Sequence, residues 1–161
     1  MPRVDYIFTD GKDLKLISPL RLKQWQYHNR RSKYFGGLFL GLDIDEVNQR
    51  LIAKASGGLL VDLAKDAETG NLVGYCLTSI NAERQGEVES IYLEPEYRHQ
   101  YIGDKLMKRA LDWMEKRAVK RKILVVGAGN EEVIAFYRHH NFEVRSIVME
   151  QVGPDNRAAI G

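Results

Sequence analysis

The stretch from Gly86 to Leu106 constrains the fold of this chain most, because it predicts a strand, a sharp stop, a short loop and a helix start in direct succession. Val88 to Leu93 is rich in aliphatic, aromatic and β-branched residues, which favour a strand. Pro95 lacks a backbone donor and ends that strand. After the polar loop from Tyr97 to Ile102, Gly103 stands where the predicted helix opens. A glycine there allows close approach to helix amides that have no partner within the helix.

A strand, a loop and a helix start of this kind form a candidate anion site, because the helix dipole adds partial positive charge at the first turn. We expect a phosphate group as the occupant. The surrounding charge favours an anion, because the stretch between Arg98 and Lys122 contains nine Lys or Arg residues and only three acidic residues. An ordinary strand-to-helix connection, followed by a solvated helix face, is the alternative interpretation.

Composition argues against several other classes of protein. A chain of 161 residues, 44% hydrophobic and 29% charged, is long enough for one globular domain with its own core. A formal net charge of +2 gives no bulk electrostatic argument for nucleic acid, and the short basic cluster from Arg30 to Lys33 is more typical of a solvated loop. Cys76 is the only cysteine, so an intrachain disulfide and a cysteine-rich zinc site are both excluded. No Gly-x-Gly-x-x-Gly follows the first predicted strand, which argues against a dinucleotide oxidoreductase.

The sequence also predicts where the protein resides. Its first residues lack the apolar region of a signal peptide, and no apolar run approaches the length of a membrane span. We therefore expect a cytoplasmic protein that binds neither membranes nor nucleic acid and needs no metal.

The apolar periodicity predicts the remaining elements. The predicted strands cover residues 4–9, 59–64, 72–80, 88–93, 121–126 and 142–152. The predicted helices cover 14–30 with a break at Ser18-Pro19, 47–56 after a cap at Asp43 or Asp45, 103–118, and 131–139. We expect an α/β (α+β) fold with a single domain over residues 1–152 and a flexible tail over 153–161, and we assign no role to the segment 29–42.

The string Ile91-Tyr92-Leu93-Glu94-Pro95-Glu96-Tyr97-Arg98, followed by Gln100-x-x-Gly103, resembles the acetyl-CoA motif of the GNAT N-acetyltransferases. That family's pattern is Gln/Arg-x-x-Gly-x-Gly/Ala, and this chain departs from it only at Lys105. The resemblance implies that the backbone amides of residues 100–105 hold the CoA pyrophosphate and that the strand end at 91–93 pairs with the pantetheine arm. The cofactor-binding residues implied here are Ile91, Tyr92, Leu93, Arg98, Gln100, Tyr101, Ile102, Gly103, Asp104 and Lys105.

A second stretch, residues 130–142, is similar to the last motif of the same family, Asn-x-x-Ala-x-x-Phe-Tyr-x-x-x-Gly-Phe. The positions that match in identity and spacing are Asn130, Phe136, Tyr137 and Phe142. Asn141 replaces the glycine, and asparagine also tolerates a left-handed conformation at a helix end. The resemblance implies that Asn130 and Phe136 belong to the CoA site and that Tyr137 faces the thioester sulfur.

The resemblance also implies a fold and a chemistry. The fold is a central mixed, mostly antiparallel twisted sheet of six to seven strands, flanked by about four helices and splayed at the acetyl-CoA site. Acyl transfer to an amine needs a base, because a protonated amine is no nucleophile, and the leaving thiolate needs a proton. Some small-amine members of the family have a glutamate at the place of Glu89, so we expect Glu89 as the base and Tyr137 as the general acid.

We therefore expect an acetyl-CoA-dependent N-acetyltransferase that acts on a primary amine by direct attack on the thioester. The acceptor stays open between a small amine, an amino acid, a protein lysine and a protein N-terminus. An acidic run slightly favours a small cationic amine. Its members are Glu83, Glu87, Glu89, Glu94 and Glu96. A non-catalytic CoA-binding or regulatory domain of the same fold is the alternative, and a homodimer is compatible with either.

Overall fold

The computed structural model describes residues 1–39 and 41–154, which form two compact units. The first unit comprises Met1–Leu22 and Asp43–Val125, and the second comprises residues 23–39, 41–42 and 126–154. The single domain expected over residues 1–152 stays a prediction, and most of the predicted flexible tail, residues 155–161, lies outside the described residues.

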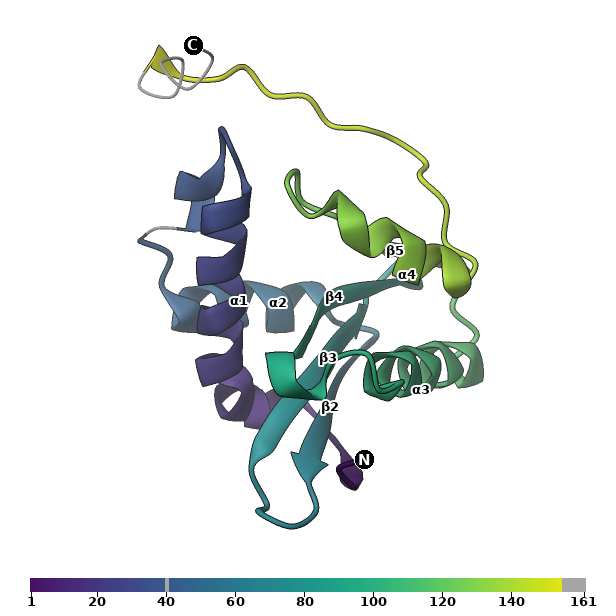
Figure 1. Cartoon of the computed structure of the whole chain (residues 1–161). Helices are drawn as coiled ribbons and strands as arrows, with labels where there is room; N and C mark the ends of the chain where they lie inside the picture. The colour runs from purple at the N-terminus through teal and green to yellow at the C-terminus, as the bar shows by residue number, and fades with distance from the viewer. Residues whose placement is uncertain (40, 155–161) are drawn as a thin grey trace. The chain divides into compact units, whose positions relative to one another are not determined.

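The first unit is built on a mixed sheet in the order β1-β2-β3-β4-β5 (Figure 1). The strands are β1 (Val4–Thr9), β2 (Gly58–Asp66), β3 (Leu72–Ile80), β4 (Gln85–Leu93) and β5 (Arg121–Leu124). Three of the pairings are antiparallel, whereas β5 lies parallel to β4. A parallel pair needs a long crossover, and the helix after β4 provides it.

The predicted α/β class and the mixed, mostly antiparallel sheet are confirmed, but the described residues hold five strands rather than six to seven. The strand predicted over residues 142–152 is wrong, because no strand is present there. Its alternation of apolar and polar residues suits a strand, but a strand forms only where a neighbour accepts its backbone hydrogen bonds. Side chains such as Ile147 and Met149 are exposed.

The described residues hold four α-helices, as predicted, together with four short 3-10 helices. The α-helices are α1 (Ser18–Arg31), α2 (Ile44–Lys54), α3 (Ile102–Lys116) and α4 (Ile134–His139). The 3-10 helices are η1 (Gly11–Ile17), η2 (Gly36–Phe39), η3 (Pro95–Tyr97) and η4 (Glu131–Val133). The predicted break at Ser18-Pro19 is the point where η1 passes into α1. Asp43 caps α2 by accepting hydrogen bonds from the amides of Asp45 and Glu46.

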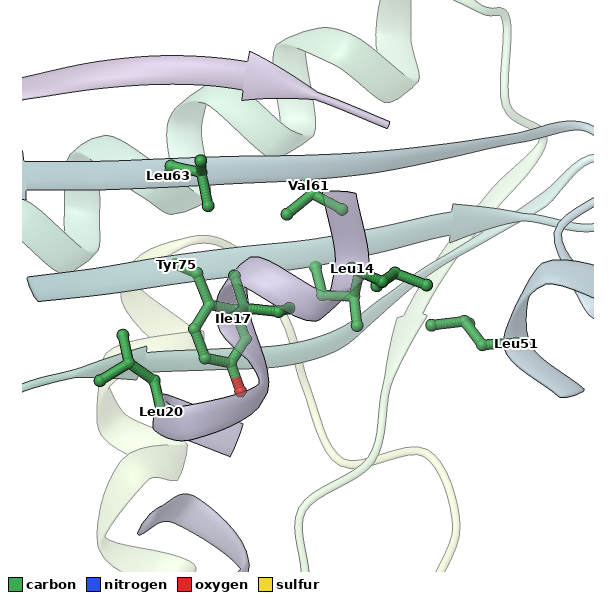
Figure 2. Packing of buried hydrophobic residues seen from close by; sticks show 8 residues of the cluster. Leu14, Ile17, Leu20, Leu51, Val61, Leu63 and Tyr75 are labelled. Carbon is green, nitrogen blue, oxygen red and sulfur yellow. The ribbon is translucent and has the colours of Figure 1, made fainter. Parts of the chain in front are cut away.

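One face of the sheet carries a hydrophobic core formed with η1, the start of α1, and α2. Figure 2 shows side chains from these helices converging on β2 and β3. The buried members of this core are Leu14, Ile17, Leu20, Leu51, Val61, Leu63, Tyr75 and Leu77. Because strand residues alternate between faces, the neighbours of Val61 and Leu63 point to the other side of the sheet.

Helix α3 covers that other face. Its buried residues recur at helical spacing and are Ile102, Leu106, Met107, Ala110, Trp113 and Met114. Gly86 of β4 permits the close approach of the helix, since a Cβ at that position would lie 2.3 Å from the Sδ atom of Met114. Cys76 is buried and its pKa is raised by burial to about 12, so it is an inert core thiol.

In the second unit, the C-terminal half of α1 holds the loop that precedes α4. The Arg31 Nε atom donates to the Gly129 carbonyl at 3.0 Å, and its guanidinium lies 2.8 Å from the Glu132 carboxylate. The Tyr27 hydroxyl donates to the same carboxylate at 2.9 Å. Gly129 has a φ of +93°, and a Cβ there would lie 2.2 Å from the Arg31 carbonyl oxygen, so this contact requires glycine.

Candidate functional site

Strand β4 has two neighbours along its first half and only one along its second half. Its pairing with β5 runs only from Gln85 opposite Arg121 to Val88 opposite Leu124. Its pairing with β3 continues to Leu93. The chain after β5 thus leaves the sheet while β4 goes on, which is the splay that the sequence predicts. A strand edge that diverges from its neighbour is where an extended ligand can add main-chain hydrogen bonds.

The loop between β4 and α3 has a strained backbone. His99 has a φ of 59° and Tyr101 a φ of 61°, both in the left-handed region that is uncommon for such residues. Tyr101 is the N-cap residue of α3, and its side chain makes no capping hydrogen bond to the first turn, in which Gly103 is the second residue. Strain of this kind clusters at ligand-binding sites, and an uncapped helix start suits an anion.

The predicted cofactor-binding residues of this loop point in several directions. The Arg98 Nε atom donates to the Leu93 carbonyl at 2.9 Å, so this arginine fastens the loop to the end of β4. The Lys105 ammonium lies over the Tyr6 ring, 5.4 Å from its centroid. Ile102 is buried, whereas Tyr101 is exposed. These residues thus lie in the loop and the first turn of α3, and the side chains of Arg98, Ile102 and Lys105 have packing contacts of their own.

A β-bulge lies in β4 at the predicted base. Leu77 of β3 pairs with Ser90, and Thr78 pairs with Val88, so Glu89 is an extra residue on its strand. The bulge places Ser90 on the same face as Glu89, and the hydroxyls of Ser90 and Tyr75 share a hydrogen bond of 2.6 Å. Bulges are frequent next to active sites because they redirect side chains.

Three side chains surround the Glu89 carboxylate. The Ser79 hydroxyl donates to its Oε1 atom at 2.6 Å. The Lys54 ammonium at the end of α2 also donates to Oε1 at 2.6 Å, and it bridges to the Glu87 carboxylate at 2.6 Å. Burial lowers the pKa of Lys54, but the hydrogen bonds to Glu87 and Glu89 outweigh burial, so its pKa is raised overall. Arg21 is buried close by, donates to Asn48 and interacts electrostatically with Glu89.

Sequence reasoning missed Lys54, Ser79 and Arg21. Lys54 lies 35 residues from Glu89 in the chain, and only the packing of α2 on the sheet joins them. The alternation of β3 and its pairing with β4 are signals that place Ser79 on the face of Glu89. For Arg21, no local sequence pattern distinguishes it from an exposed basic residue such as Lys23.

The second motif folds as an aromatic cluster in the second unit. The rings of Phe136 and Tyr137 meet edge to face at 5.3 Å, and the Tyr137 ring lies 6.4 Å from that of Phe142. Asn141 follows the end of α4 with a φ of 65°, which confirms the left-handed conformation predicted for it. Asn130 precedes η4, and its Oδ1 atom is buried and accepts no hydrogen bond from the described residues.

Comparison with known proteins identifies the family. Residues 22–142 match the family described as acetyltransferase (GNAT) family. The chain belongs to the GNAT family. The family assignment made from the sequence, that of an N-acetyltransferase, is thereby confirmed. A curated relative is an uncharacterised N-acetyltransferase of Methanocaldococcus jannaschii, 29% identical over 72 residues. The match spans 45% of this chain but only about a third of the relative, 32%.

Solved structures of GNAT proteins share the fold. The PaiA N-acetyltransferase of Thermoplasma acidophilum, solved in complex with coenzyme A, is 21% identical, with a TM-score of 0.69 over 91% of this chain and 93% of that one. A GCN5-related N-acetyltransferase of Ralstonia eutropha is 15% identical, with a TM-score of 0.71 over 93% and 99%. The ribosomal-protein-alanine N-acetyltransferase of Brucella melitensis is 20% identical, with a TM-score of 0.63 over 92% and 99%.

Two further observations concern the part of the chain that the structure describes. None of its helices is both long and apolar enough to cross a membrane. It contains no group of three or more His, Cys, Asp or Glu residues arranged to hold a metal ion. The cytoplasmic location, the independence from metals and the homodimer stay predictions.

Proposed function

We propose that this GNAT protein transfers the acetyl group of acetyl-CoA to a primary amine, which attacks the thioester directly. The observation that carries the proposal is the conjunction at β4, where the strand diverges from β5, carries the bulged Glu89 and leads through a strained loop into an uncapped helix. The coenzyme A bound to the Thermoplasma relative supports the choice of cofactor.

In this proposal the cofactor lies along the end of β4 and the start of α3. The backbone amides of residues 100–105 bind the pyrophosphate, and residues 91–93 pair with the pantetheine arm. The backbone carries this recognition, which agrees with the structural contacts that occupy the Arg98 and Lys105 side chains. Asn130 and Phe136 of the second motif complete the predicted cofactor site.

The cofactor assignment predicts that Gly103→Glu abolishes CoA binding, because the new side chain adds bulk and negative charge at the helix start. At a CoA concentration of roughly 100 times Kd, binding stabilises the parent protein by about 2.7 kcal/mol. Thermal melting with and without CoA measures this shift, which should vanish in the variant. Gly37→Glu is the matched control, since apart from its chain neighbours no described residue has an atom within 4 Å of a Cβ at Gly37. Equal stabilisation of parent and Gly103→Glu would refute the pyrophosphate assignment.

The proposed chemistry assigns the base to Glu89 and the acid to Tyr137. Glu89 takes a proton from the acceptor ammonium, the neutral amine attacks the carbonyl carbon, and the departing thiolate takes the Tyr137 proton. The hydrogen bond from Ser79 orients the Glu89 carboxylate and leaves its other oxygen for the acceptor.

If Glu89 is the base, Glu89→Gln should lower turnover by roughly 100-fold at neutral pH. Raising the pH should partly restore turnover, because more of the acceptor is then already neutral. Glu87→Gln is the matched control, since it removes the same charge beside the same lysine without removing the base. A pH–rate profile of both variants measures the difference. A similar loss of turnover in both variants would assign the effect to the negative charge beside Lys54 rather than to a base at Glu89.

The acceptor is a primary amine in this proposal, and its identity requires a screen. The structure weakens the inclination towards a small cationic amine, because Lys54 already pairs with two of the five acidic residues that suggested it. Thiol release from acetyl-CoA should be measured with a polyamine, free amino acids, a lysine peptide and a peptide with a free N-terminus. Acceptor-dependent thiol release establishes the enzyme, whereas CoA binding without release favours the non-catalytic CoA-binding domain.

A further inference from the structure

The chain presents a primary ammonium of its own to the proposed base. Lys54 is the last residue of α2, and its Nζ atom lies 2.6 Å from the Glu89 carboxylate and 2.6 Å from that of Glu87. The lysine side chain is 42% exposed, while the carboxylates are 15% and 18% exposed. An alkylammonium in hydrogen-bond contact with a carboxylate base has the geometry that a primary amine acceptor needs before proton transfer.

We propose that Lys54 is itself an acceptor, so that the protein acetylates its own Lys54 side chain from acetyl-CoA. This inference rests on the proposed function, with Glu89 as the base. Glu89 takes one proton from the Lys54 ammonium, and the nitrogen lone pair attacks the carbonyl carbon. The new C–N bond forms as the C–S bond breaks. The nitrogen loses a second proton, the leaving thiolate gains one, and the products are N-acetyl-lysine, free CoA thiol and one released proton.

The contacts of Lys54 make this reaction slow. Its pKa is raised overall, since the hydrogen bonds to Glu87 and Glu89 outweigh the effect of burial, so little of the amine is neutral near pH 7. Proximity compensates, because a group held beside the base needs no encounter with a second molecule. Self-acetylation is therefore slower than turnover of a good external acceptor and independent of protein concentration.

Acetylation of Lys54 changes the charge of the acceptor side of β4. Arg21 and Lys54 balance Glu87 and Glu89 in the structure, and loss of the lysine charge makes this group net negative. The two carboxylates that held Lys54 then become available to an external ammonium. Acetylation of Lys54 therefore makes the site electrostatically more favourable for a cationic acceptor.

The experiment incubates the purified full-length protein with acetyl-CoA carrying an isotopically labelled acetyl group, and peptide mass spectrometry follows each lysine. Lys122 is the internal control, because it is 27% exposed and also paired with a carboxylate, that of Glu115 at 2.7 Å. Lys54 should acquire label at least about tenfold faster than Lys122. Gly103→Glu, first checked by its melting curve, should reduce the label on Lys54 to the level of Lys122. Dilution of the protein should not change the rate.

Label on Lys54 and Lys122 at equal rates, or label on Lys54 that survives Gly103→Glu, overturns the proposal and indicates uncatalysed acetylation. A rate that falls on dilution overturns the intramolecular step. Thiol release with external amines but no label on Lys54 overturns this inference and leaves the proposed function standing. Absence of both thiol release and label refutes the proposed function as well.

Discussion

Replacing Arg109 with glutamine should lower the free energy of unfolding by about 3 kcal/mol at neutral pH, because it leaves a buried carboxylate without its partner. Asp62 on β2 is 0% exposed, and Arg109 on α3 is 25% exposed. The guanidinium holds both carboxylate oxygens, through Nε at 2.7 Å and a terminal nitrogen at 3.0 Å. It also lies 3.9 Å from the centroid of the Phe8 ring. Urea unfolding of the parent and the variant measures the loss.

The loss of stability caused by Arg109→Gln should become smaller as the pH falls. Burial already raises the pKa of Asp62, although the hydrogen bond and charge of Arg109 lower it, so removing Arg109 raises the pKa further. The folded variant then binds more protons than the unfolded chain, whose aspartates titrate near ~3.9. The contribution of Asp62 to the stability of the variant is therefore fully present below that value and is lost as the pH rises through the folded pKa.

Two further variants make this prediction specific. Lys108→Gln on the same helix removes an exposed pair with Asp112 and should change the stability by less than about 0.5 kcal/mol. Adding Asp62→Asn to Arg109→Gln removes the buried charge and should restore part of the loss together with its pH dependence. A double variant as unstable as Arg109→Gln, with the same pH profile, would contradict the role assigned to the ion pair.

Local sequence predicted the ends of β4, α2, α3 and α4 because the determinants of these boundaries are local. Pro95 follows the end of β4, Gly103 lies in the first turn of α3, and Asp43 caps α2. The left-handed Asn141 after α4 follows from the same kind of rule, since few residue types tolerate that conformation. Each of these features depends on a few neighbouring residues, so its position could be predicted from the sequence without knowledge of the tertiary packing.

The contacts around Glu89 depend on packing between distant segments, and there the sequence was insufficient. The bulge at Glu89 is a property of two strands in register, which neither strand encodes alone. The sequence shows Glu87 and Glu89 as part of an acidic run, and only the fold brings Lys54 of α2 to them. The strand predicted at 142–152 failed for a related reason, since its pattern specifies a face and no pairing partner.

Removal of the Tyr137 hydroxyl should lower turnover by roughly 100-fold, the contribution expected of a positioned general acid. The ring of Tyr137 packs against those of Phe136 and Phe142 in the second unit, and phenylalanine preserves that packing. Tyr137→Phe should therefore leave the stability and the affinity for acetyl-CoA nearly unchanged. An interaction needed only as the thiolate departs reduces kcat and kcat/KM equally and leaves binding intact.

The matched control is Tyr6→Phe, which deletes a hydroxyl in the first unit while keeping the ring under Lys105 and Arg109. It should retain full turnover, so a general effect of losing a tyrosine hydroxyl would be recognised. Steady-state kinetics with the best amine of the panel and calorimetric titration with acetyl-CoA separate chemistry from binding. Loss of acetyl-CoA binding in Tyr137→Phe would make this residue part of the binding site rather than the acid. Unchanged turnover would show that the thiolate leaves without help from Tyr137, because a thiolate with a low enough proton affinity departs unaided and collects its proton from water.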